Sequence, residues 1–101
     1  EINAIIDTGS EITMCSDVLY QKFPPIPLQL SNIILSGISK EPISPLGWFN
    51  TNIGIDNFTI NANIYVIDKM QFDFIIGLDV LNCLDIHFAN GKLFVKNTST
   101  P

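Results

Sequence analysis

Two neighbouring runs of alternating residues restrict the fold of this chain more than any other feature. From 57 to 66 every second residue is apolar, and from 49 to 55 the alternate positions are Phe49, Thr51, Ile53 and Ile55. Side chains that alternate in this way face opposite sides of a half-buried strand. Asp56 and Asn57, between the two runs, are turn formers. The sequence therefore predicts a β-hairpin from about Trp48 to Ile67.

The C-terminal third contains two more local signals. Asn90-Gly91, a strong two-residue hairpin signal, lies between apolar residues that alternate over 86–95. We therefore expect a second hairpin there. Between the two hairpins, apolar residues at helical spacing over 78–84 directly follow Gly77, which predicts a short helix.

The stretch between the prolines at 24–27 and Trp48 is expected to form an extended loop and then a hairpin arm. Ile33–Leu35 and Ile43–Phe49 have the composition of strands, and the residues between them are polar and turn-like. Pro42 and Pro45 have no N–H to donate to a sheet. This favours an edge or a protruding arm over a central strand.

Composition agrees with these local patterns. The chain has 101 residues, which is the size of one domain with one modest core. It contains 17 Ile, 4 Val and 7 Phe, and such β-branched and aromatic residues favour strands. We predict a single all-β domain.

Charge, hydropathy and cysteine spacing argue against several functions. The net charge is −5 and all five basic residues are Lys, with no basic cluster, so nucleic acid is not an expected partner. No apolar run approaches the roughly 18 residues that span a bilayer, so we expect a soluble chain without a membrane partner. Cys15 and Cys83 are far apart and in no Cys/His cluster. We therefore expect no disulfide and no metal site, but two buried thiols in a reducing compartment.

The stretch 5–10, Ile-Ile-Asp-Thr-Gly-Ser, contains the best catalytic candidate. Asp7 follows two large aliphatic residues, which suggests a carboxylate at the end of a buried strand. Such a carboxylate is costly unless hydrogen bonds or a partner charge stabilise it. Gly9 lets the backbone turn and direct amide N–H groups at Asp7, and Ser10 adds a hydroxyl within reach. Three residues also recur by chance, so a simple strand-end turn is an equal alternative at this point.

Two motifs together give this chain a resemblance to a known family. The stretch 4–10 resembles the active-site loop of aspartic proteases. The stretch 74–81, Phe-Ile-Ile-Gly-Leu-Asp-Val-Leu, resembles the hydrophobic-hydrophobic-Gly segment that passes this loop in the family and leads into a short helix. Their order and spacing resemble retropepsins, particularly those of gypsy-type or Bel-type LTR retrotransposons. Ubiquitin-shuttle proteins of the DNA-damage-inducible type carry a similar domain.

The resemblance implies a fold and a mechanism. The fold would be a retropepsin-like closed β-barrel or sandwich with a flap hairpin and one short helix near 78–84. A single Asp-Thr-Gly in so short a chain implies a homodimer, in which Asp7 meets Asp7 of its mate at the twofold axis. The two carboxylates would share one proton and activate a water molecule to hydrolyse a peptide bond, with no metal or other cofactor.

The resemblance also implies a role for each residue of the loop. Asp7 would be catalytic, and Thr8 would brace the two loops across the axis. Gly9 would approach the backbone of an extended peptide substrate. Ser10 would hydrogen-bond the Asp7 carboxylate.

The arm around 37–47 would be the flap, which closes over the substrate and excludes water. Gly37 and Ile38 are its implied substrate-binding residues. The tip reads Ile-Ser-Lys-Glu-Pro over 38–42, which departs from the glycine-rich tip of many retropepsins.

The domain is expected to span 1–97, with 98–101 as a linker. Retropepsins have about two strands before the active-site loop, whereas six residues precede Asp7 here, so the N-terminal strands are expected to be missing. The leading hypothesis is a dimeric aspartic endopeptidase that matures a retroelement polyprotein in the cytoplasm, within virus-like particles. The alternative is an inactive retropepsin-like module for dimerisation or peptide binding. An unrelated β-barrel with a chance Asp-Thr-Gly would leave the second motif unexplained.

Overall fold

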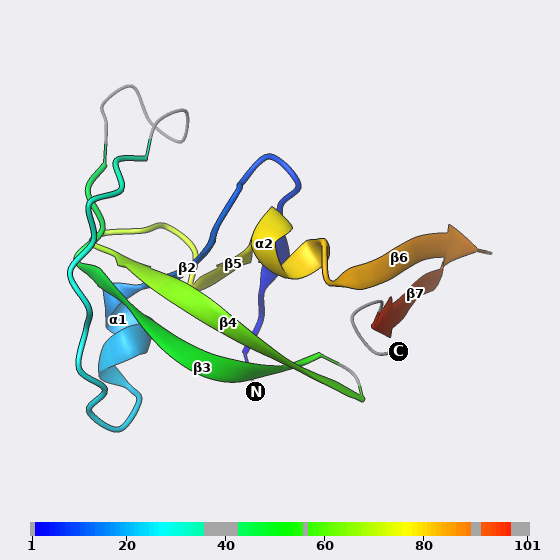
Figure 1. Ribbon diagram of the computed structural model, residues 1–101, viewed down its shortest axis with the longest axis horizontal. Helices are drawn as coiled ribbons and strands as arrows, with labels where there is room; N and C mark the ends of the chain where they lie inside the picture. Colours follow the sequence, from blue (N-terminus) through cyan, green and yellow to red (C-terminus); the bar gives the residue numbers. More distant parts are fainter. Residues whose placement is uncertain (1, 36–42, 56, 90–91, 98–101) are drawn as a thin grey trace.

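The computed structural model describes residues 2–35, 43–55, 57–89 and 92–97 (Figure 1). Five strands form one mixed sheet in the order β1-β5-β2-β4-β3, and β6 and β7 form a separate hairpin. The predicted all-β fold is confirmed. The elements are β1 (Ile5–Ile6), β2 (Thr13–Ser16), α1 (Asp17–Gln21), β3 (Gly47–Ile55), β4 (Phe58–Ile67), β5 (Phe74–Ile76), α2 (Leu78–Leu81), β6 (Leu84–Ala89) and β7 (Lys92–Asn97).

The hairpin of β3 and β4 is the longest pairing in the sheet and confirms the prediction from alternation. Its antiparallel register runs without a bulge from Gly47 opposite Val66 to Ile55 opposite Phe58. The apolar residues of β4 are buried at alternate positions, and Asn61 between them is exposed. On the exposed face the Asn61 amide donates to the side-chain oxygens of two asparagines on β3. Asp56, in the predicted turn, lies outside the described residues.

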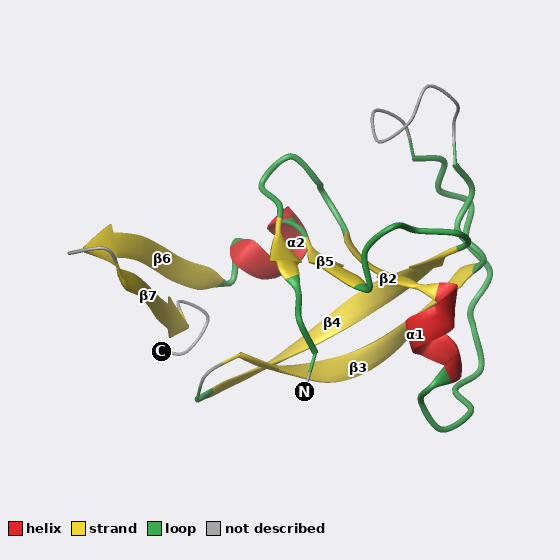
Figure 2. Ribbon diagram, turned by 180° about the vertical axis from the view of Figure 1, so that it is seen from behind, coloured by secondary structure: helices red, strands yellow, loops and turns green. Residues whose placement is uncertain are grey.

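The C-terminal hairpin is also confirmed. β6 and β7 pair antiparallel from Leu84 opposite Asn97 to Ala89 opposite Lys92. The predicted turn, Asn90-Gly91, lies outside the described residues. Both views place this hairpin beyond α2, to one side of the five-stranded sheet (Figures 1 and 2).

The arrangement of β1, β5 and β2 positions the loop that contains Asp7. β5 lies between the other two strands, parallel to β1 and antiparallel to β2. The 7–12 loop joins β1 to β2 and must therefore cross the end of β5, where α2 begins. The second motif thus forms the strand β5, which was not predicted, followed by the predicted short helix. The helix ends at Leu81 rather than at residue 84, where β6 already begins.

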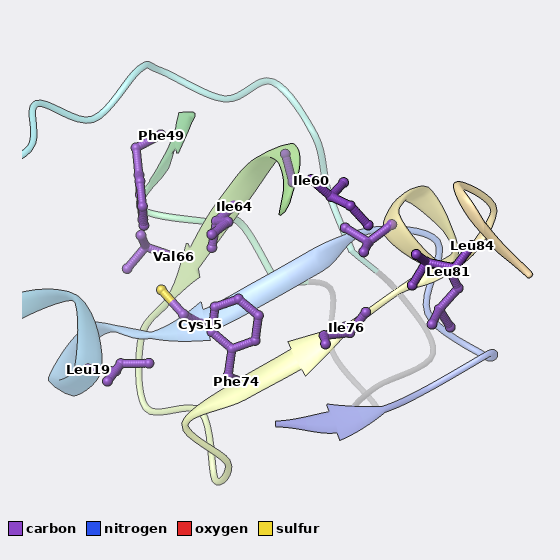
Figure 3. Close-up of a cluster of buried hydrophobic side chains, with 12 residues drawn as sticks. Cys15, Leu19, Phe49, Ile60, Ile64, Val66, Phe74, Ile76, Leu81 and Leu84 are labelled. Carbon is purple, nitrogen blue, oxygen red and sulfur yellow. The ribbon is translucent and has the colours of Figure 1, made fainter. Parts of the chain in front are cut away.

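The core lies between the β3–β4 hairpin, α1 and the two short strands β2 and β5 (Figure 3). A smaller group of Met14, Ile67 and Ile75 is also buried. Apolar burial of this kind is the main favourable term in folding. The larger cluster contains Cys15, Leu19, Phe49, Ile60, Ala62, Ile64, Val66, Phe74, Ile76, Val80, Leu81 and Leu84.

Helix α1 was not predicted. Ser16 is its N-cap and its side-chain oxygen accepts a hydrogen bond from the Leu19 N–H at 3.0 Å. Five residues are too few to show helical periodicity. A serine followed by Asp17 was the available signal, because both residue types favour helix starts.

The predicted arm is only partly extended in the structure. Leu35 and Ile43 form a single antiparallel bridge, and β3 begins only at Gly47, so the two strands predicted over 33–35 and 43–49 are wrong in extent. Pro45 has no N–H to continue a ladder, which explains the interruption. The predicted flap tip, with Gly37 and Ile38, lies outside the described residues.

No helix in the described ranges is long and apolar enough to cross a membrane. The predicted linker, 98–101, also lies outside the described residues.

Candidate active site

Asp7 directly follows β1, and backbone groups on both sides of it form hydrogen bonds with its main chain and its carboxylate. The Asp7 N–H donates to the carbonyl of Ile76 at 3.0 Å, which anchors the start of the loop on β5. The Ser10 N–H donates to the Asp7 carbonyl at 3.2 Å and closes a tight turn. Within this turn the Gly9 N–H donates to Asp7 Oδ1 at 2.8 Å. The loop thus directs an amide at the carboxylate, as expected from the sequence.

Gly9 leaves little room for a side chain. A Cβ at this position would lie 3.2 Å from Asp7 Oδ1. Gly9 and Thr8 are exposed, and Asp7 is half-buried. The carboxylate is therefore held by the loop and still accessible at the surface of one chain.

The strand before Asp7 is not buried in one chain, contrary to the prediction. Ile5 is 39% exposed and Ile6 is 50% exposed. β1 is a two-residue edge strand that pairs with β5, and no other strand among the described residues covers its second edge.

The Ser10 hydroxyl also differs from the expectation. It donates to the carbonyl of Ile12 at 2.8 Å rather than to the Asp7 carboxylate. Ser10 is buried. Its observed contact stabilises the loop backbone.

The C-terminal half of the loop is hydrogen-bonded to the start of α2. The Leu78 N–H donates to the Ser10 carbonyl at 2.8 Å, and the Asp79 N–H donates to the Glu11 carbonyl at 3.2 Å. Gly77 lies so close that a Cβ there would be 2.2 Å from the Ile12 carbonyl oxygen. The glycine of the second motif therefore allows the close approach of the two segments.

A hydrogen-bond network between the buried Thr13 and the exposed Asp79, missed from the sequence, joins the end of the loop to the same segment. Thr13, with 0% exposure, donates from Oγ1 to Asp79 Oδ1 at 2.7 Å and from its N–H to Asp79 Oδ2 at 3.1 Å. Thr13 Oγ1 also accepts from the Gly77 N–H at 3.1 Å. The only sequence signal was an acidic residue two positions after the glycine of the second motif.

The structure brings four of the predicted site residues, Asp7 to Ser10, into one turn. It does not place the predicted flap residues Gly37 and Ile38, which lie outside the described ranges. Among the described residues no group of three or more His, Cys, Asp or Glu is arranged to hold a metal ion.

The cysteines are not linked by a disulfide. Cys15 is buried as predicted, whereas Cys83 is only half-buried and its thiol donates to the Asp79 carbonyl at 3.6 Å. Burial, and secondarily the charge of Asp17, raises the pKa of the Cys15 thiol from 9.0 to about 12. A thiol that stays protonated in this way is a packing group rather than a nucleophile.

An apolar cavity of about 480 Å³ lies elsewhere in the molecule. Its lining comes from the N-terminal segment, the loop after α1 and the sheet, with Ile2, Phe23 and Ile53 among its residues. No residue of the 7–10 turn lines it, so this cavity is separate from the catalytic candidate.

The fold that carries this turn is of the retropepsin-like, all-β class. The structure is similar to the crystal structure of the retroviral protease-like domain of Ddi1 from Leishmania major, with a TM-score of 0.62 and 19% sequence identity. The similarity covers 95% of this chain and 79% of that chain. No protein-family model matches the sequence. No curated protein matches it either.

Proposed function

We propose that this chain is an aspartic endopeptidase that works as a homodimer, with Asp7 of each subunit as the catalytic group. The observation that carries the proposal is the geometry of the Asp7 turn. An accessible carboxylate, held by the Gly9 N–H at 2.8 Å, lies where the loop crosses the end of β5. The similarity to a retroviral protease-like domain supports the same assignment at the level of the fold.

The chemistry of the site supports the proposed homodimer. An acid and a base are both needed, and the chain has one Asp-Thr-Gly turn. A twofold axis beside the turn would supply a second, identical carboxylate. The exposure of Ile5 and Ile6 next to Asp7 is compatible with a partner surface there. In such a dimer Thr8 would brace the two turns across the axis.

Two carboxylates a few Å apart do not both ionise readily, so the pair would hold one proton and titrate as a unit. The ionised Asp7 acts as general base for a water molecule that attacks the peptide carbonyl. The protonated Asp7 of the mate acts as general acid toward the leaving amine. The Gly9 N–H holds the carboxylate in place through its hydrogen bond to Asp7 Oδ1.

We propose an extended peptide as the substrate, bound along the turn with Gly9 close to its backbone. The cleaved protein would be a polyprotein of a gypsy-type or Bel-type retroelement, processed in the cytoplasm or in virus-like particles. The net charge of −5 supports a protein substrate over nucleic acid.

The test is cleavage of a peptide library at pH about 5, near where such dyads titrate, by the parent chain and by Asp7→Asn. The matched control is Asp68→Asn, which removes an exposed carboxylate far along the chain from the turn. We expect cleavage by the parent and by the control and none by Asp7→Asn. Cleavage that survives Asp7→Asn would refute the mechanism. Peptide binding without cleavage in the parent would favour the binding module instead.

A further inference from the structure

We propose that Thr13 and Asp79 are positioning residues that set the Asp7 turn for catalysis. This inference rests on the proposed function and adds two residues that do not touch the reacting atoms. The pair is separated by 66 positions in the sequence and is joined by two direct hydrogen bonds.

The turn has two anchors on the segment of the second motif. The first is the bond from the Asp7 N–H to the Ile76 carbonyl. The second lies at the far end, where the start of α2 binds Ser10 and Glu11 through their carbonyls and Thr13 through its side chain. Thr8 and Gly9 lie between the anchors. The position of the Gly9 N–H relative to the carboxylate therefore depends on both.

The second anchor depends on an acceptor-only group at position 79. Three donors converge on the Asp79 carboxylate: the Thr13 N–H, the Thr13 hydroxyl and the Val80 N–H. An ionised carboxylate accepts all three, whereas an asparagine amide has a single acceptor oxygen. An asparagine would therefore leave at least one of these donors without its present partner.

The Thr13 hydroxyl both donates and accepts a hydrogen bond. Its oxygen accepts the Gly77 N–H and its proton goes to Asp79, and the side chain is completely buried. Without the hydroxyl the buried Gly77 N–H would lose its acceptor, and a buried donor without a partner is costly. The segment of Gly77 would then shift away from the loop it anchors.

The experiment compares Thr13→Val with Thr13→Ser, which keeps the hydroxyl, and with Asp79→Asn. We expect Thr13→Val to lower kcat on the order of 100-fold with little change in KM, because a misplacement of about 1 Å has that effect. Thr13→Ser should keep kcat within about threefold of the parent, since the hydrogen bonds remain. The kcat of Asp79→Asn should lie between those of Thr13→Val and Thr13→Ser. Ser16→Ala, which loses the cap of α1 outside this network, controls for general destabilisation and should leave kcat unchanged.

A second readout does not depend on activity. The amide proton resonance of Gly9 reports its hydrogen bond to Asp7, and Asp7→Ala gives its position when that bond is lost. We expect the Gly9 resonance in Thr13→Val to shift toward that position and to stay in place in Thr13→Ser.

A folded Thr13→Val with the parent's kcat and an unshifted Gly9 resonance would overturn the inference. If Thr13→Val does not fold, Asp79→Asn decides by the same two readouts. If the parent chain does not cleave peptides, the proposed function fails. The Gly9 resonance then still decides whether Thr13 and Asp79 set the turn.

Discussion

Replacement of Gly77 by alanine tests how closely the second motif supports the catalytic turn. The new Cβ would lie 2.2 Å from the Ile12 carbonyl oxygen and 2.9 Å from the Ser10 carbonyl oxygen. Both are backbone atoms, so the loop has to move away. Forced overpacking costs about 1–3 kcal/mol. The move also breaks the hydrogen bonds to the Ser10 and Glu11 carbonyls, which contribute about 1 kcal/mol each.

The expected loss in the free energy of unfolding is therefore about 3–5 kcal/mol, a large part of the 5–15 kcal/mol of an ordinary domain. The assay is urea denaturation at a fixed chain concentration, because association would change the apparent stability. Gly54→Ala is the control, since a Cβ there meets nothing within 4 Å. It should be neutral or stabilise by up to about 1 kcal/mol. Equal stabilities for Gly77→Ala and Gly54→Ala would refute the reasoning.

Three further substitutions test local features. Ser16→Ala should lower stability by about 1 kcal/mol, because it removes the N-cap of α1, and an unchanged urea midpoint would contradict this. Lys69→Gly should raise stability by about 0.5–1 kcal/mol. Lys69 has a φ of 60°, and the steric cost of this left-handed conformation for lysine exceeds the extra conformational entropy that glycine loses on folding. A lower urea midpoint would contradict this. The Cys15 thiol, with its pKa raised from 9.0 to about 12, ionises first in the unfolded chain. The free energy of unfolding is therefore unaffected by this thiol below pH 9 and should fall by about 1.4 kcal/mol by pH 10. The slope of stability against pH in Cys15→Ala should lack this fall, and identical slopes would contradict the assignment.

The parts of the fold that the sequence predicts are those with a local cause. The alternation over 49–55 and 57–66 reflects a hairpin with one face on the core, and the structure has that hairpin in an unbroken register. The helix after Gly77 was predicted from the helical spacing of the apolar residues that follow it, and the structure has a helix at Leu78–Leu81. The turn at Asp7 was predicted for the same reason, because Gly9 permits it within three residues.

The parts that escaped prediction depend on contacts between distant residues. The pairing of Thr13 with Asp79 spans 66 positions and leaves no local pattern. The exposure of Ile5 and Ile6 depends on which strands cover β1, not on their own side chains. The Ser10 contact is a local exception, two positions apart, in which the path of the backbone brings the hydroxyl to the Ile12 carbonyl and not to the Asp7 carboxylate.

The measurement that tests the central claim most directly is the rate of peptide cleavage against chain concentration, in dilution series of the parent and of Asp7→Asn. If two Asp7 side chains form the site, the rate should rise with the square of chain concentration at low concentration and become proportional to it once the dimer is complete. Asp7→Asn should give no rate at any concentration. A rate proportional to concentration throughout, or one that Asp7→Asn retains, would contradict a site made from two copies of the turn.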